Sequence, residues 1–378
     1  MRFADIIGQE EVKAFFVRQH AEQRLPHAQL LVGHPGGGAF LLALAYAQYL
    51  GCEQRRDGDS CGECPCCRAM QAFTHPDLHL CLPEAGVRSG VDPMDVYVEQ
   101  LQVLRSLMVE NPYFTEQEWY SALGATGKQG IISAATSGRI IETLFYKSRM
   151  LPFKFMVLWL PERMHVVAAN KLLKVLEEPS RGTVFLLVTE HEELILPTVY
   201  SRLQRVTVPP IALPAMREAL VGRLGCEEQQ ADQVAHWAGG DFSRAQALVN
   251  QSFSPEVLSA FQELMRAAYS TDVERLLGWV DEAAALDREQ LKATVRYYAQ
   301  LLRAAFMMNI GLPELGYCRP EEAQFLNNFC PYTNGRNVGR LLYECSNLLE
   351  HLYRNGHQKI LLTDFAFRLS RLLGPGLR

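Results

Sequence analysis

An eight-residue stretch, residues 33–40, has the glycine spacing of a phosphate-binding loop, with Gly33, Gly36 and Gly38 in the pattern. Working loops of this type continue with a Lys that binds the β- and γ-phosphates and a Ser or Thr whose hydroxyl binds Mg²⁺. This chain has Ala39 and Phe40 at those two positions. The pattern therefore predicts a strand–loop–helix scaffold that has lost side chains needed for ATP hydrolysis.

A second position shows the same kind of loss. In ATPases with such a loop, an Asp that holds Mg²⁺ and a Glu that polarises water would follow the strand predicted at 155–160. Here Pro161 stands in place of the Asp, and only Glu162 remains. A lone Glu after a strand is more often a solvated loop residue than a catalytic base. The joint absence of Lys, hydroxyl and Asp argues against hydrolysis.

Half of the chain's 10 cysteines are clustered between positions 52 and 67. In a reducing compartment, such a cluster indicates a metal site rather than a disulfide framework. The order Cys-x8-Cys-x2-Cys-x2-Cys can close around one tetrahedral Zn²⁺, and a set of four thiolates leaves no open position for catalysis. We therefore predict a structural zinc module with the ligands Cys52, Cys61, Cys64 and Cys67, where Cys66 is the alternative to Cys67 and free thiols are the alternative to metal.

Two arginines have the chemistry to act on a phosphate group. Ser201 and Arg202 lie just beyond the last predicted core strand. Arg202 is either an ordinary surface charge or a finger that reaches the γ-phosphate of a neighbouring subunit. The residues alone do not separate these interpretations. Arg244 is equally open between a salt bridge at a helix start and a nucleotide contact.

The composition excludes several classes of protein. No uncharged apolar run approaches the roughly 18 residues of a membrane span, and the N-terminal residues lack the apolar core of a signal peptide. These features predict a cytoplasmic protein with no membrane partner. The net charge of −5 argues against a stand-alone nucleic-acid binder, which is normally basic, but it leaves open a subunit that meets DNA within a larger assembly.

The apolar pattern predicts an α/β fold in the first half of the chain. Strands that are apolar on both faces alternate with helical segments, which indicates a parallel sheet covered on each side. The Gly- and Pro-containing segment 85–150 interrupts this pattern, so we expect a loop insertion there. After residue 210 the pattern is helical, and the length of 378 residues favours two or three domains. The expected strands are 29–32, 78–82, 155–160 and 184–188, and the expected helices include 41–50, 166–176, two or three within 213–251, 291–307 and 338–353.

Several motifs occur in an order that is typical of one family. Asp-Ile-Ile-Gly-Gln begins at Asp5, Leu-Pro-His-Ala at Leu25 and His-Pro-Asp at His75, with the cysteine module between the last two. More specific are Asn-Lys-Leu-Leu-Lys with Leu-Glu-Glu-Pro over 170–179 and the stretch 195–202, which ends in Ser-Arg. Together they resemble the delta prime family of bacterial DNA polymerase III clamp-loader subunits, which are AAA+ proteins. The chain departs from the family at Leu203, where Cys is usual, and in its longer segment 85–130.

The resemblance implies a P-loop AAA+ core at 1–208 that contains the zinc module at about 52–67 and the insertion at about 85–130. It also implies a helical lid at 209–252 and an all-α collar for oligomerisation at 253–378. Such subunits do not hydrolyse ATP, and the residues leave open whether the degenerate loop still binds nucleotide.

The same resemblance implies that Arg202, beside Ser201, is an arginine finger acting in trans. Arg244 matches a position that contacts nucleotide in active relatives. The implied partners are the gamma/tau ATPase and delta, with the sliding clamp and primer–template DNA reached through the complex.

Two other functions compete with this interpretation. A working gamma/tau-like clamp-loader ATPase would need Lys at 39 and Asp at 161, and this chain has neither. A zinc-dependent DNA-binding protein that uses an AAA+ fold would bind DNA alone, in a manner sensitive to salt.

Overall fold

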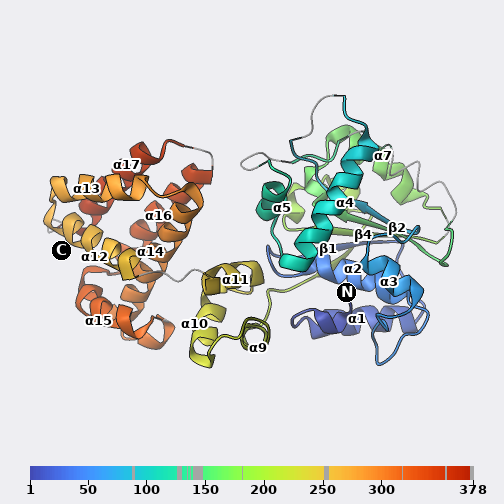
Figure 1. The fold of residues 1–378 in the computed structure, drawn as a ribbon, viewed down its shortest axis with the longest axis horizontal. Helices are drawn as coiled ribbons and strands as arrows, with labels where there is room; N and C mark the ends of the chain where they lie inside the picture. Colours follow the sequence, from blue (N-terminus) through green and yellow to red (C-terminus); the bar gives the residue numbers. More distant parts are fainter. Residues whose placement is uncertain are drawn as a thin grey trace. The chain divides into compact units, whose positions relative to one another are not determined.

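The computed structural model describes residues 1–86, 90–125, 130–133, 135–136, 138, 148–180, 182–250, 255–316, 318–353 and 356–374. The chain forms two compact units, residues 1–247 and 248–378. Figure 1 colours both units along the sequence, from the N-terminal residues in blue to the C-terminal helices in red. The first unit carries the sheet and every candidate site residue, and the second is helical in its described part.

A five-stranded parallel sheet with the order β2-β3-β4-β1-β5 is the centre of the first unit. The four strands expected from the sequence are present, which confirms the predicted parallel sheet. The fifth strand, β5, was missed because it lies at the sheet edge and only Val206 of its four residues is buried. The strands are β1 (Ala28–Val32), β2 (Leu78–Cys81), β3 (Lys154–Trp159), β4 (Thr183–Thr189) and β5 (Gln204–Thr207).

Helices cover both faces of this sheet. Helix α2 (Ala39–Gly51) is buried along its whole length and contacts β1, β3 and β4. Helix α7 (Val166–Glu177) packs through Leu172 and Leu176 onto side chains that alternate along the strands. Two covered faces explain why β3 and β4 are buried throughout and mostly apolar. The other short helices of the core are η1 (Phe3–Asp5), α1 (Glu10–Ala21), α3 (Pro65–Gln71), η2 (Pro161–Arg163), η3 (Glu192–Leu194) and α8 (Pro197–Tyr200).

The segment expected as a loop insertion contains two helices. Helix α4 (Pro93–Glu110) begins at Asp92, whose side chain accepts the Met94 N–H, and α5 (Glu116–Ala122) begins with a Thr115–Glu118 capping box. A loop was therefore the wrong expectation for these two stretches. Glycines and prolines lie at or beyond the ends of these helices and do not interrupt them. Residues 87–89 and 126–129 lie outside the described residues.

The first unit ends in three short helices, as the sequence predicted. They are α9 (Leu213–Leu224), α10 (Glu228–Ala238) and the beginning of α11 (Phe242–Asn250). Gly225 and Gly239 cap the first two helices in the left-handed conformation. The boundary between the two units falls within α11.

The second unit has a hydrophobic core of its own. Phe261, Tyr298, Trp279 and Phe365 are buried in it with many aliphatic side chains. Its helical character confirms the predicted all-α C-terminal region. The helices are α12 (Pro255–Ser270), α13 (Val273–Ala284), α14 (Arg288–Asn309), η4 (Pro313–Leu315), α15 (Pro320–Phe329), η5 (Cys330–Tyr332), α16 (Val338–Tyr353) and α17 (Gln358–Leu373). In the part of the chain that the structure describes, no helix is both long and apolar enough to cross a membrane.

A buried carboxylate fixes the connection that leads into β3. Asp77 is 1% exposed, and its oxygens accept the backbone N–H groups of Arg149, Met150 and Leu151 at 2.6, 2.7 and 2.9 Å. Burial acts to raise the pKa of Asp77, but these three hydrogen bonds outweigh it and hold the pKa below its ordinary value. The ionised form therefore stabilises the fold, above the ordinary carboxyl pKa, and this stabilisation is lost as the pH falls through the lowered pKa.

We expect Asp77→Asn to lower the free energy of unfolding by about 1–3 kcal/mol at neutral pH, because charge-assisted hydrogen bonds to a buried acceptor are lost. The difference from the unchanged chain should shrink below about pH 4, where the unfolded carboxyl group is also protonated. Denaturant unfolding at several pH values measures both effects. Asp232→Asn, at an exposed position of α10, is the control. A loss at neutral pH no larger than that of the control would contradict this role for Asp77.

Candidate functional site

The loop at residues 33–40 connects β1 to α2, and its glycines allow other side chains to approach closely. Gly36 and Gly38 have φ values of +62° and +84°, which side chains rarely adopt. A Cβ at position 36 would overlap the carboxylate of Asp241, and one at position 38 would lie 2.8 Å from the Tyr113 ring. Gly33 donates its N–H to the Thr189 carbonyl at 3.0 Å. The predicted loop shape is therefore present, with protein groups against it.

Aromatic side chains pack together beside the loop. The Phe40 ring lies 5.3 Å from that of Trp159 and 6.0 Å from that of Phe114, measured between centroids. Tyr113 packs against Phe242 at 5.0 Å, and its hydroxyl accepts the Ile7 N–H at 2.7 Å. The position of the Mg²⁺-binding hydroxyl is therefore occupied by a buried ring.

A small cavity lies beside the loop. Its volume is about 20 Å³, and its lining includes His34, Phe40, Tyr113 and Glu190. Pockets that hold drug-sized ligands have volumes of about 300–1,000 Å³. A cavity of this size has room for roughly one water molecule.

Carboxylates surround the same loop. Asp241 accepts the Arg244 N–H at 2.9 Å at the start of α11, and the next residue, Phe242, donates its N–H to the Gly36 carbonyl at 3.0 Å. Burial raises the pKa of Asp241 to about 6. Burial, followed by the charge of Glu116, raises the pKa of Glu190 to about 8. At neutral pH Asp241 is mostly ionised, so its charge would repel a polyphosphate.

Glu162 is more constrained than the solvated loop residue that its sequence position favoured. It is partly buried, and its carboxylate accepts the Thr189 hydroxyl at 2.8 Å. Burial raises the pKa of Glu162. The residue before it, Pro161, is buried and offers no ligand for Mg²⁺.

Arg202 and Ser201 lie on the surface of the first unit, directly after α8. The Arg202 guanidinium donates to the Thr198 carbonyl at 2.7 Å and forms an ion pair with Glu177 at the end of α7. The Ser201 hydroxyl donates to the same carbonyl at 3.2 Å. The side chain of Arg202 is 35% exposed. These contacts leave the guanidinium at the surface, outside the lining of the cavity beside the loop.

Arg244 lies in the first turn of α11, two residues after Phe242, which contacts the loop. Its positive charge acts to lower the pKa of Asp241, against the larger effect of burial. The two groups are therefore near enough to interact, and Arg244 is otherwise exposed.

The four cysteines predicted as ligands lie together in the structure. The Sγ atoms of Cys52, Cys61, Cys64 and Cys67 all lie within 4.8 Å of one another, and this group does not include Cys66. Cys52 follows α2, Cys64 caps α3 and Cys67 lies in its first turn. The Cys66 sulfur is buried on the other side of the turn, beside Gly51.

The donor set fits a tetrahedral Zn²⁺. Zinc–sulfur bonds of 2.3 Å place neighbouring sulfurs about 3.8 Å apart, and the separations are 3.6 Å for Cys52–Cys61 and 3.9 Å for Cys61–Cys67. Backbone N–H groups point at the sulfurs, as in Cys64 N to Cys61 Sγ at 3.3 Å and Cys67 N to Cys64 Sγ at 3.4 Å. The N–H groups of Glu63 and Cys64 lower the pKa of Cys61 to about 6, which favours the thiolate that binds metal.

Sequence reasoning did not identify three residues that define the loop's surroundings: Tyr113, Phe114 and Asp241. All three come from segments far from the loop in the chain. One local signal was available, because the aromatic pair directly precedes the Thr-x-x-Glu capping box at 115–118 and an apolar pair before a helix start often packs inward.

Comparison of the sequence with known proteins assigns this chain to a family. The model of the family described as "DNA polymerase III, delta subunit" matches residues 8–212, more than half of the 378-residue chain. The chain is 27% identical over 361 residues to DNA polymerase III subunit delta' of Escherichia coli, with 93% of this chain and 91% of the relative covered. It is 31% identical over 234 residues to subunit delta' of Pseudomonas aeruginosa, with 62% and 57% covered.

A solved structure of a DNA polymerase III gamma subunit-related protein from Thermotoga maritima aligns with 96% of this chain and 98% of its own, at 16% identity and a TM-score of 0.41. The match of the family model and the delta' relatives confirms the resemblance inferred from the motifs. The chain therefore belongs to the DNA polymerase III delta subunit family, and its relatives in that family include delta' subunits.

Proposed function

We propose that this chain is a non-hydrolysing delta prime subunit of a replicative clamp loader. In this role it helps to load the sliding clamp onto primed DNA, together with delta and the gamma/tau ATPase. The observation that carries the proposal is the filled loop: Tyr113 and Asp241 lie against its glycines, and the cavity beside it has a volume of about 20 Å³. A subunit that does not hydrolyse ATP would contribute to clamp loading through its shape and its contacts with the other subunits.

The repacked loop supports the absence of both binding and hydrolysis. The Lys, hydroxyl and Asp that hydrolysis requires are replaced by Ala39, Phe40 and Pro161, and all three of these residues are buried. Asp241 adds a negative charge beside Gly36, where a phosphate would lie. Steric exclusion and charge repulsion therefore act in the same direction.

Arg202 is proposed to act in trans at the ATP site of the adjacent gamma/tau subunit, with Ser201 shaping the turn that presents it. Its guanidinium is at the surface, and its partners there are a carbonyl and an exposed carboxylate. Exposed ion pairs contribute only about 0–1 kcal/mol, so a γ-phosphate on a neighbour can displace Glu177. The planar, permanently charged guanidinium suits the negative charge that develops during phosphoryl transfer.

We propose a division of the chain into an AAA+ core at 1–208, a lid at 209–252 and a collar at 253–378. The lid corresponds to α9, α10 and α11, and the collar to the helical unit with its own core. Contact of Phe242 with Gly36 supports a lid held against the loop. The zinc module at 52–67 is proposed to be structural because four thiolates leave no open coordination position.

The two competing functions are less well supported. A gamma/tau-like ATPase would need space for ATP and a cation at position 39, where Ala39 is buried instead. A zinc-dependent protein that binds DNA alone would normally be basic, whereas this chain has a net charge of −5.

We expect neither Mg-ATP nor ADP to bind the isolated chain at up to 1 mM. A ligand that binds the native state raises the melting temperature, so Tm should change by less than about 1 °C. Calorimetric titration is the second measurement. Micromolar binding of either nucleotide would contradict the filled site.

We expect Arg202→Ala to leave the fold intact and to slow ATP turnover in the reconstituted loader. The rate of ATP hydrolysis at the one adjacent site should fall by about 10³-fold, as for other arginine fingers. The total ATP turnover of the loader should therefore fall by the contribution of that site. Arg205→Ala is the matched control because Arg205 is also exposed and ion-paired nearby, with Glu192. Turnover that is unchanged by Arg202→Ala would refute the finger.

We expect one zinc ion per chain by elemental analysis, and loss of that zinc in Cys67→Ala. The control is Cys66→Ala, which removes a neighbouring buried thiol outside the four-sulfur group and should retain the metal. Retention of zinc in Cys67→Ala together with its loss in Cys66→Ala would reverse the ligand assignment.

A further inference from the structure

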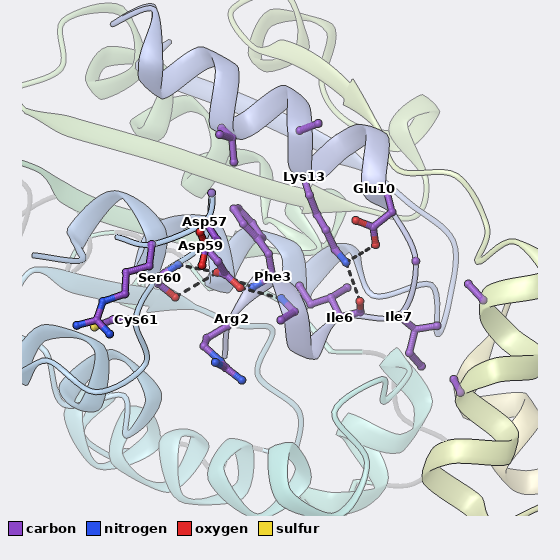
Figure 2. A pocket seen from close by; sticks show the side chains of 18 of the residues that line it. Arg2, Phe3, Ile6, Ile7, Glu10, Lys13, Asp57, Asp59, Ser60 and Cys61 are labelled. Atoms are coloured by element: carbon purple, nitrogen blue, oxygen red, sulfur yellow. Dashed lines mark hydrogen bonds and ion pairs between the residues drawn. The ribbon is translucent and has the colours of Figure 1, made fainter. Parts of the chain in front are cut away.

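The N-terminal segment, residues 2–8, lies across the cysteine module. The carboxylate of Asp59 accepts the backbone N–H groups of Phe3 and Ala4, both at 2.9 Å. Asp59 belongs to the stretch between the ligands Cys52 and Cys61, and Figure 2 shows it directed toward the backbone at Phe3. One side chain of the metal module therefore satisfies two backbone donors of the segment.

The position of Asp59 depends on a tight turn that the module closes. Arg56 and Asp59 exchange backbone hydrogen bonds of 3.0 and 2.8 Å around Asp57 and Gly58, which both have positive φ. The adjacent Ser60 is buried, and its hydroxyl accepts an N–H from the Gln48 side chain at 2.9 Å. Residues 53–60 include no apolar side chain, so hydrophobic packing does not fix the path of this turn, and a metal bound by Cys52 and Cys61 would add to the constraint from these hydrogen bonds.

A second contact joins the segment to the module. The Arg2 side chain runs beside Gly62, between Cys61 and Cys64, where a Cβ on Gly62 would lie 3.1 Å from Arg2 Cδ. The segment thus touches both stretches of chain that link the first three ligands.

The far end of the segment contacts helix α9 and Tyr113, whose ring lies against the loop at residues 33–40. The Asp5 carbonyl accepts a hydrogen bond from the Arg223 guanidinium at 2.6 Å, and the Ile6 carbonyl accepts one from Lys13 at 2.8 Å. The Ile7 N–H donates to the Tyr113 hydroxyl at 2.7 Å. Gly8 packs against Ala215 of α9.

Most residues of the segment also line an open cleft of about 1160 Å³ (Figure 2). Its walls are the segment itself, α1, the turn at 56–59 and α9. The segment therefore contacts the cysteine module on one side and helix α9 on the other.

We propose that the metal held by the four cysteines fixes the N-terminal segment through Asp59, and that the segment passes this constraint to α9 and Tyr113. The inference rests on the zinc site proposed above. When the metal leaves, the turn gains conformational freedom, and the two hydrogen bonds from Phe3 and Ala4 to Asp59 are lost. Phe3 keeps its packing against Phe16 and Tyr49, so the segment loosens locally while the sheet stays folded.

Hydrogen exchange of the full chain, read by mass spectrometry of peptides, tests this coupling. The samples are zinc-loaded chain, chelated chain with zinc content measured, and the zinc-loaded variants Asp59→Asn and Asp57→Asn. Asp57 lies in the same turn but makes neither hydrogen bond to the segment, so its variant is the matched control. The peptides that matter cover 2–8, the end of α9, Tyr113, and β4 as a marker of the sheet.

We expect chelation and Asp59→Asn each to speed exchange in 2–8 by about tenfold or more, because a charged acceptor protects these amides. A smaller increase should appear at the end of α9 and around Tyr113, while β4 and the Asp57→Asn chain stay unchanged. Unchanged exchange in 2–8 after zinc has left would overturn the coupling, and unchanged exchange in Asp59→Asn would overturn the role of Asp59. An equal rise in β4 would mean global unfolding and would also overturn it.

A chain without stoichiometric zinc would refute both the zinc site and the coupling. Turnover in the Arg202→Ala loader is independent of all these samples, so failure of the finger is recognised separately.

Discussion

Phe40 lies where three parts of the first unit meet. It begins the buried helix after the loop, and its ring contacts Trp159 at the end of β3 and Phe114 from the segment between α4 and α5. An apolar ring at this position is stable only when other side chains shield it from water. That requirement draws residues 112–114 over the loop and explains why the inserted helices pack as part of the core.

The polar contacts around the loop complete the same packing. In an active phosphate-binding loop, backbone N–H groups and a helix N-terminus face an anion from the ligand. Here the protein supplies its own carboxylate, Asp241, which also caps α11 and lies against Gly36. Contacts within the protein therefore join the loop to the following helix α11.

The sequence predicted those parts of the fold that depend on local pattern. Strands buried on both faces and the mostly apolar helix α2 could be predicted because every residue in them is buried. The edge strand β5 carried too few buried residues to be seen, and glycines and prolines concealed α4 and α5. The cysteine cluster was also predictable from local pattern, because its four cysteines lie close together in the chain.

The contents of the candidate site were not predictable in this way. Tyr113 and Asp241 reach the loop from about 70 to 200 residues away in the sequence, and no periodicity encodes such contacts. The sequence showed which catalytic groups were missing, but only the structure shows what replaced them. The proposed role of Arg202 requires a phosphate on a second subunit, which neither the sequence nor a single chain contains.

The filled loop also limits the evolutionary routes open to this chain. A lysine at position 39 would place an ammonium group at a buried position beside Phe40, where an unpaired charge is costly. Making room for phosphates would further require Tyr113 and Phe114 to withdraw and Asp241 to be replaced. Each of these steps alone removes side-chain contacts from the core of the first unit. A substitution at position 39 by itself therefore leaves the packing of Tyr113, Phe114 and Asp241 around the loop in place.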